Sequence, residues 1–134
     1  MIFELELILR LIISFVLSMI IGFEREISLK PAGLRTHILV SVASTLFTIL
    51  SFHAFPGSDP SRLAASILVG IGFIGAGTII KTKEKIIGLT TATTLWIVTS
   101  IGIAVGAGYY LLASVVSVLA YLILKLGKFD KEIH

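Results

Sequence analysis

Five apolar runs, each long enough to cross a lipid bilayer, dominate this sequence and leave only short charged connections between them. The runs cover residues 7–23, 37–54, 63–80, 88–106 and 109–126. A helix needs about 17–25 residues to cross the hydrocarbon core, and only helices or closed barrels satisfy their backbone there. Because the runs are continuous rather than alternating, we predict an all-α integral membrane protein, a compact bundle of about five transmembrane helices.

Composition agrees with a chain whose main solvent is lipid. Of the 134 residues, 56% are hydrophobic and 14% are charged, whereas roughly a quarter are charged in soluble domains. No linker divides the chain, so we expect one transmembrane domain, 1–127, and a short cytoplasmic tail, 128–134. The sequence has no cysteine, which excludes disulfides and thiolate chemistry. Lys and Arg in a membrane protein reflect topology, so the net charge of +3 does not indicate a nucleic-acid partner.

Lys and Arg alternate between the successive connections. With Lys125, near the end of the fifth run, counted in the tail, the segments between and at the ends of the runs carry, in order, none, three, one, three, none and three of these residues. The positive-inside rule therefore predicts that the N-terminus lies outside and the C-terminus in the cytoplasm. The glycine-rich stretch 102–108 leaves open a broken or re-entrant segment between the fourth and fifth runs.

Polar residues follow one helical face in three of the runs. They are Arg10, Ser14, Ser18, Gly22 and Arg25 in the first, His37, Ser41, Ser44, Thr48 and Ser51 in the second, and Tyr110, Ser114, Ser117 and Tyr121 in the fifth. Such a face avoids lipid. It indicates either hydrogen bonds between packed helices, worth about 0.6 kcal/mol each in a membrane, or a path for an ion or solute.

Small residues indicate where helices approach one another closely. They are Gly70, Gly72, Gly75 and Gly77 in the third run, and the small-xxx-small pair Gly102 and Gly106 in the fourth. The first three also match the dinucleotide motif G-x-G-x-x-G, but that motif requires a preceding strand. We therefore expect helix packing at these glycines. A helix break that exposes backbone to a ligand is the alternative.

Charged and polar side chains at the ends of the runs form the candidate ligand site. They are Glu24, Arg25, Glu26, Arg35, His37, Asp59, Arg62, Thr90 and Thr91. Glu24 and Glu26 offer hard oxygen ligands and are the best candidates for binding Mg²⁺, although they could equally pair with the arginines. Asp59 suits the start of a helix. No nucleophile–base–orienter set is readable, so we predict no enzymatic activity and no other cofactor.

Five sequence blocks resemble the MgtC/SapB family of bacterial inner-membrane proteins. They are GFERE at 22–26, PAGLRTH at 31–37, DPSRLAA at 59–65, GIGFIGAG at 70–77 and GLTTATTLW at 88–96. The resemblance implies a multi-pass regulator or accessory protein of magnesium homeostasis, acting by helix contact on a membrane ATPase or transporter. A transporter or channel for a cation or small solute is the alternative, and the glycine faces would also suit a homodimer.

The resemblance is strongest to the short SapB-like form. Many family members carry a soluble C-terminal domain similar to an ACT fold, and we expect no such domain here. Virulence-type members often have Asn in place of Thr90 and a Cys in the fourth span, and this sequence has neither. We therefore expect the magnesium-related role more than the virulence-related one.

Overall fold

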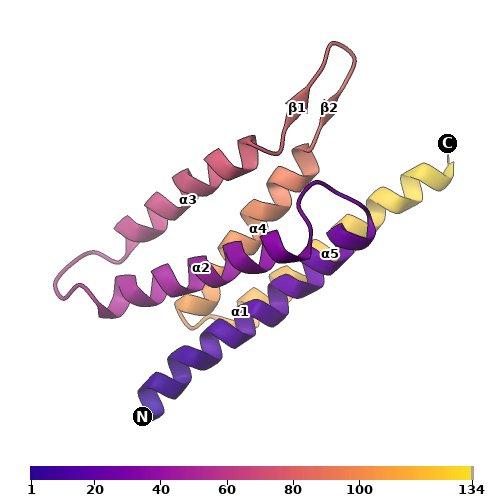
Figure 1. The fold of residues 1–134 in the computed structure, drawn as a ribbon. Coiled ribbons are helices and arrows are strands. Elements are labelled where there is room, and N and C mark those ends of the chain that lie inside the picture. Colours follow the sequence, from indigo (N-terminus) through magenta and orange to yellow (C-terminus); the bar gives the residue numbers. More distant parts are fainter. Residues whose placement is uncertain (134) are drawn as a thin grey trace.

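The helical membrane bundle is confirmed by a computed structural model, which describes the backbone of residues 1–133 and the side chains of residues 1–128. Its elements are α1 (Ile2–Ile27), α2 (Leu34–His53), α3 (Ser61–Ala76), β1 (Ile80–Lys81), β2 (Ile86–Ile87), α4 (Leu89–Gly106) and α5 (Tyr110–Ile133) (Figure 1). Helices α1, α2, α4 and α5 are long and apolar enough to cross a membrane. Helix α3, with 16 residues, is shorter, at about 24 Å.

The third apolar run does not stay helical to residue 80, as its composition predicted. Helix α3 ends at Ala76, and the antiparallel hairpin β1–β2 follows, with Ile80 opposite Ile87. Gly88 adopts a φ of +89°, and a Cβ there would overlap the carbonyl oxygen of Thr78. The base of the hairpin therefore closes directly onto the start of α4, and the hairpin projects beyond the helices (Figure 1).

Helix α4 forms the centre of the bundle because two of its glycines let it touch α2. A Cβ on Gly102 would lie 2.8 Å from the Cβ of Ser44, and one on Gly106 would lie 2.6 Å from the Cβ of Thr48. The Thr45 hydroxyl also donates to the Gly102 carbonyl at 3.0 Å. Close backbone approach of this kind is the main source of helix association in lipid.

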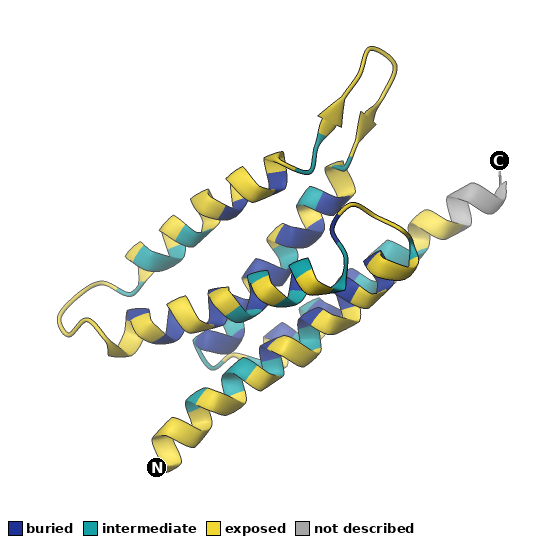
Figure 2. Cartoon of the chain, in the orientation of Figure 1, coloured by how far each residue is buried: buried dark blue, intermediate teal, exposed yellow. Residues whose placement is uncertain are grey.

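The polar stripes of α1 and α2 face inward. Ser14, Ser18, His37, Ser41 and Thr48 are buried, while large apolar side chains cover the outside, as the exposed outer faces in Figure 2 show. Most of the stripe hydroxyls donate within their own helix, as Ser44 does to Val40 and Thr48 to Ser44. The stripes thus fill helix interfaces with short, internally bonded side chains.

Two glycines of α3 do not pack against the described part of this chain. A Cβ on Gly70 or Gly72 would meet no described atom within 4 Å, whereas one on Gly75 would make ordinary contact with Ala92 of α4 at 3.5 Å. Gly77 caps the end of α3. Because α3 rests on α4 mainly through its buried residues Ile71 and Gly75, Gly70 lies beside an open cleft toward α2, and Gly72 lies on the other side of the helix, which is exposed.

The fourth and fifth runs are separate, unbroken helices. Helix α4 continues through Gly102 to Gly106, and Gly108 makes the turn to α5 with a φ of +90°. The re-entrant alternative is therefore wrong, because Gly102 packs against α2 within a regular helix. The proposed tail, 128–134, begins as a continuation of α5. The side chains of 129–133 and all of residue 134 lie outside the described part.

Two matched glycine substitutions test the central contact. Gly102→Ala should destabilise the fold by about 1–3 kcal/mol, because the new methyl group overpacks the α2–α4 interface. Gly72→Ala should leave stability unchanged or slightly raised, since its methyl group enters open space. Unfolding of both variants in detergent micelles measures the difference. Equal stabilities of the two variants would contradict the close contact between α2 and α4, because they would mean that a methyl group at position 102 meets no more resistance than one at position 72.

Candidate functional site

A buried ion pair lies at the end of α1. Glu24 and Arg25 are each 4% exposed, and Arg25 Nη1 lies 3.6 Å from Glu24 Oε2. Gly22, one turn earlier, admits α2 so closely that its Cβ would lie 3.0 Å from the Cα of Leu34. This approach of α2 encloses the last turn of α1, which sequence analysis had placed in a loop.

Three other elements supply partners for the pair. The Ser28 hydroxyl donates to Glu24 Oε1 at 2.7 Å, and Lys128 Nζ of α5 lies 3.6 Å from the same oxygen. Arg25 Nη2 donates to the Thr91 hydroxyl of α4 at 3.2 Å. Two atoms of the pair, Glu24 Oε2 and Arg25 Nε, have no hydrogen-bond partner among the residues whose side chains are described. The pair therefore ties α1, α4 and α5 together.

His37 is fully buried beside this pair. Its Nδ1 lies 2.7 Å from the Gly33 carbonyl oxygen, and its Nε2 lies 2.8 Å from the Thr94 hydroxyl. A carbonyl only accepts, so Nδ1 carries a proton. His37 therefore joins the first turn of α2 to α4, with both ring nitrogens engaged in the contact between helices.

A cleft of about 660 Å³ opens over the ion pair. We call it the charged cleft and define it by its lining, which includes Glu24, Arg25, Ser28, Lys30, Ile86, Thr90, Thr91, Leu124 and Lys128. Thr90 is exposed at its rim and Thr91 is buried beneath it. Sequence analysis missed Ser28, Lys30 and Lys128. The signal for the two lysines was present, but it was used only to orient the chain.

Glu26 and Arg35 lie in a different, smaller cleft of about 400 Å³. Glu26 Oε2 accepts a hydrogen bond from the Leu34 backbone N–H at 2.8 Å and so caps the start of α2. Glu24 and Glu26 therefore do not form the suggested two-carboxylate Mg²⁺ site, because residues two apart point to different sides of a helix. Within the described side chains, no group of three or more acidic or histidine residues could hold a metal ion.

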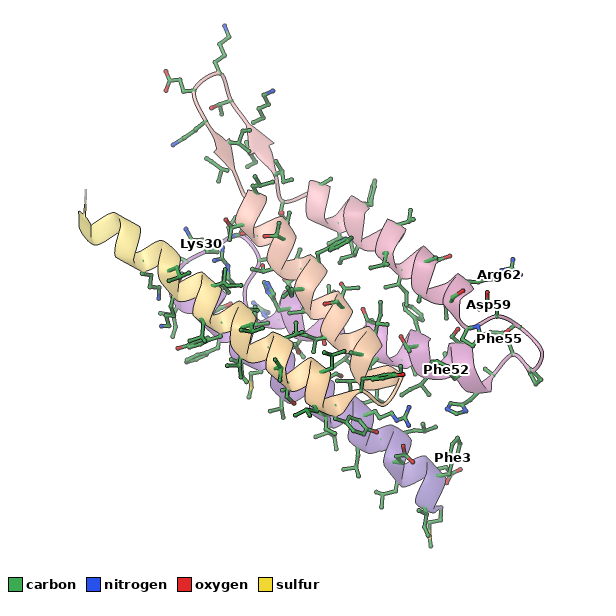
Figure 3. The ribbon with its side chains drawn as sticks, turned by 180° about the vertical axis from the view of Figure 1, so that it is seen from behind. Phe3, Lys30, Phe52, Phe55, Asp59 and Arg62 are labelled. Atoms are coloured by element: carbon green, nitrogen blue, oxygen red, sulfur yellow. The ribbon has the colours of Figure 1, made fainter. Side chains whose placement is uncertain are left out.

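Asp59 and Arg62 lie at the opposite end of the molecule from Lys30 (Figure 3). Asp59 Oδ1 accepts a hydrogen bond from the Ser61 backbone N–H at 2.9 Å, just before α3 begins. This bond, with help from the Ser61 hydroxyl and the Arg62 charge, lowers the pKa of the Asp59 carboxyl. Asp59 therefore stabilises the start of α3. The nine candidate residues lie in three separate places: at the charged cleft and the ion pair beneath it (Glu24, Arg25, His37, Thr90 and Thr91), at the smaller cleft (Glu26 and Arg35), and at the start of α3 (Asp59 and Arg62).

Arg10 closes the far end of α4. Its Nη1 donates to the Gly106 carbonyl oxygen at 2.6 Å, and its guanidinium also pairs with Glu6. A cation at a helix C-terminus satisfies a carbonyl that the helix leaves unpaired. Arg10 is therefore accounted for by packing and capping within the described chain.

The comparisons with known proteins agree with this architecture. Residues 11–132 match the MgtC family. The chain belongs to this family. It is 43% identical over 128 residues to YhiD of Escherichia coli strain K12, whose name describes a proposed magnesium transporter; the match covers 90% of this chain and 60% of that protein. No solved structure matches the chain significantly.

Two further relatives carry the family's other names. The chain is 44% identical to SapB of Bacillus subtilis, in a match that covers 78% of this chain and 49% of that protein. It is also 44% identical to MgtC of Brucella abortus, in a match that covers 78% of this chain and 44% of that protein. The chain therefore spans about half the length of these relatives. Together with its apolar helices, the match identifies a multi-pass bacterial membrane protein, consistent with the inner membrane.

The Glu24–Arg25 pair should be energetically coupled. Arg25→Ala leaves a buried carboxylate short of its main counter-charge and should cost about 3–5 kcal/mol. The double variant with Glu24→Ala should lose less than the sum of the single losses, by at least about 0.5 kcal/mol. Unfolding in detergent of all four proteins closes the cycle. Additive losses would mean that the two side chains act independently.

Asp59 should show its low pKa directly. A carboxyl whose pKa is depressed by folding contributes stability above its unfolded pKa and loses that contribution as pH falls through the folded pKa. An NMR titration of the Asp59 carboxyl carbon should therefore give a pKa below the usual aspartate range. Ser61→Pro removes the donated N–H and should raise the pKa, whereas an unshifted pKa in both proteins would contradict the capping role.

Proposed function

We propose that this chain is a non-enzymatic membrane regulator that acts on a membrane ATPase or transporter through the outer face of α3. The observation that carries the proposal is the exposure of Gly72, where a Cβ would meet no atom of the described chain within 4 Å. Glycine inside a helix costs about 0.5–1 kcal/mol relative to alanine. Contact with lipid does not offset this loss of helix stability. Packing against a second helix does offset it, because that helix can approach the bare backbone closely.

The surroundings of Gly72 support the same function. Val69 and Phe73, which are 77% and 85% exposed, lie beside it. Ala76 completes a small-xxx-small pair with Gly72 on the exposed side of α3. This face combines small residues with large exposed apolar side chains, a pattern that suits a packed transmembrane helix.

The proposed process is magnesium homeostasis. It is supported by the name of the YhiD relative, which is that of a proposed magnesium transporter. A protein that regulates an ATPase or a transporter fits this process as well as a transporter does. Because the chain spans 60% of YhiD, the activity of the longer protein comes to this chain only as part of the proposal.

Cross-linking from α3 tests the proposal. A photoreactive side chain at position 72 should label a membrane ATPase or transporter in native membranes, and the same group at position 111 of α5, where Leu111 is 80% exposed, should not. Gly72→Leu should abolish the contact and leave the fold intact. Labelling from position 72 that yields only a second copy of this chain would replace the regulator with a homodimer and contradict the proposal.

Cation transport is the second candidate, and Glu24 is the observation that favours it. This buried carboxylate lines the charged cleft and has one oxygen without a hydrogen-bond partner. Three cations, Arg25, Lys30 and Lys128, line the same cleft and oppose the entry of Mg²⁺.

Flux measurements separate the two candidates. We expect no Mg²⁺ uptake by proteoliposomes above that of empty vesicles. Uptake that Glu24→Gln removes, and that the exposed control Glu4→Gln preserves, would establish transport and overturn the regulator as the primary function.

A further inference from the structure

The charged cleft combines a cationic rim with apolar walls. Arg25, Lys30 and Lys128 supply the rim, and Ile27, Ile86 and Leu124 supply the walls. Ile27 and Ile86 are 60% and 56% exposed, so the walls are continuous with the apolar outside of the bundle. A ligand that fits this cleft has an anionic group beside an apolar body, or is a small anion alone.

The charge of the lining favours an anion over a cation. Among the described side chains of the lining, Glu24 is the one acidic residue against three cations, which leaves a net charge of 3 − 1 = +2 for this part of the chain. The carboxylate is already held by Ser28, Lys128 and Arg25. Lys30, on the exposed loop after α1, makes no ion pair among the described side chains and is free to bind a ligand.

The start of α4 adds backbone donors to the same cleft. Leu89, Thr90 and Thr91 all line it, and no side chain caps this helix. The first backbone bond of the helix type is donated by Ala92 to Gly88, so the three preceding N–H groups have no partner within the helix. Helix starts of this kind attract phosphate groups through these donors and the helix dipole.

An independent observation comes from the buried ion pair beneath the cleft. Arg25 lines the cleft and is 4% exposed, yet its Nε has no hydrogen-bond partner within the described part of the chain. Buried polar atoms in folded proteins nearly always have a partner, and each exception calls for an explanation. An anionic ligand bound in the cleft would supply an acceptor for this N–H through a bridging water.

We propose that the charged cleft binds a phosphate group, which Lys30, Arg25 and the first turn of α4 hold while the apolar walls receive the body of a lipid. The group could belong to an anionic lipid headgroup or to free phosphate, since both present the same oxygens. A lipid fits better, because the cleft opens at the end of the spanning helices, beside exposed apolar side chains. This inference is independent of the proposed contact on α3.

Ligand-dependent stability of the whole chain tests the site. A ligand that binds only the folded state raises the melting temperature, and the stabilisation grows with the logarithm of one plus its concentration over its dissociation constant. We would titrate phosphatidic acid into detergent-solubilised protein, and inorganic phosphate in a parallel arm, with chloride at equal ionic strength and phosphatidylcholine as controls. Phosphatidic acid should raise the melting temperature above both controls.

Two lysine variants make the test specific. Lys30→Ala should weaken the apparent affinity for phosphatidic acid about tenfold, which corresponds to one lost charge-assisted contact. Lys83→Ala removes the same charge from the loop of the hairpin, outside the cleft lining, and should bind as the unaltered protein does. Both lysines are exposed, so neither variant should disturb the fold.

The outcomes divide clearly. Stabilisation by phosphatidic acid alone identifies a lipid headgroup, and stabilisation by both ligands identifies the phosphate group itself as sufficient. The proposal is overturned if neither ligand exceeds its control, if the two lysine variants bind equally, or if Mg²⁺ stabilises the protein and phosphate does not.

Discussion

The close contact between α4 and α2 is the interaction on which the rest of the bundle depends. Lipid is as apolar as leucine, so helices in a membrane gain little from hiding hydrophobic side chains and rely on close packing. Gly102 and Gly106 permit that packing, and their partners Ser41, Ser44 and Thr48 are small enough to meet a bare backbone. Once α4 is seated on α2, its other sides are available to α1, α3 and α5, all of which contact it.

The ion pair of Glu24 and Arg25 is stable only because of that arrangement. Removing two charges from water costs several kcal/mol for each, which a single contact of 3.6 Å does not recover. Ser28, Lys128 and Thr91 make up the difference from three directions. Their convergence requires the start of α4 and the C-terminal part of α5 to lie beside the end of α1. The charged cleft therefore depends on the packing of these helices.

Periodicity and length in the sequence were sufficient to predict the helices and their inward faces. The hairpin was not predictable in this way, because Ile79 and Ile80 read equally well as the end of an apolar helix. The left-handed conformation of Gly88, close against Thr78, explains how the chain leaves the hairpin and enters α4. Composition also cannot say which glycine faces a neighbour. Gly72 and Gly102 carry the same signal, but one is open and the other is tightly packed.

The candidate site shows a similar division. The residue types at the ends of the runs suggested that the carboxylates could pair with the arginines, as Glu24 does with Arg25, and helical geometry alone would have separated Glu24 from Glu26. The contribution of Lys128, more than a hundred positions from Glu24, depends on tertiary packing that no local pattern contains. Arg62 and Asp59 were grouped with the site by chemistry alone, and distance along the bundle separates them (Figure 3).

Helix α4 connects the two surfaces for which we propose functions. Its first turn lines the charged cleft at Thr90 and Thr91, and Ala92, one residue later, contacts Gly75 on the inner side of α3. The base of the hairpin that joins α3 to α4 is held tightly against the start of α4, because a Cβ on Gly88 would overlap the carbonyl oxygen of Thr78. A ligand at the start of α4 and a partner on the outer face of α3 would therefore contact the same pair of packed helices. Coupling between two sites requires such a shared element, and it is reciprocal: if the ligand altered the affinity of the α3 face, a partner bound there would alter the affinity of the cleft by the same factor.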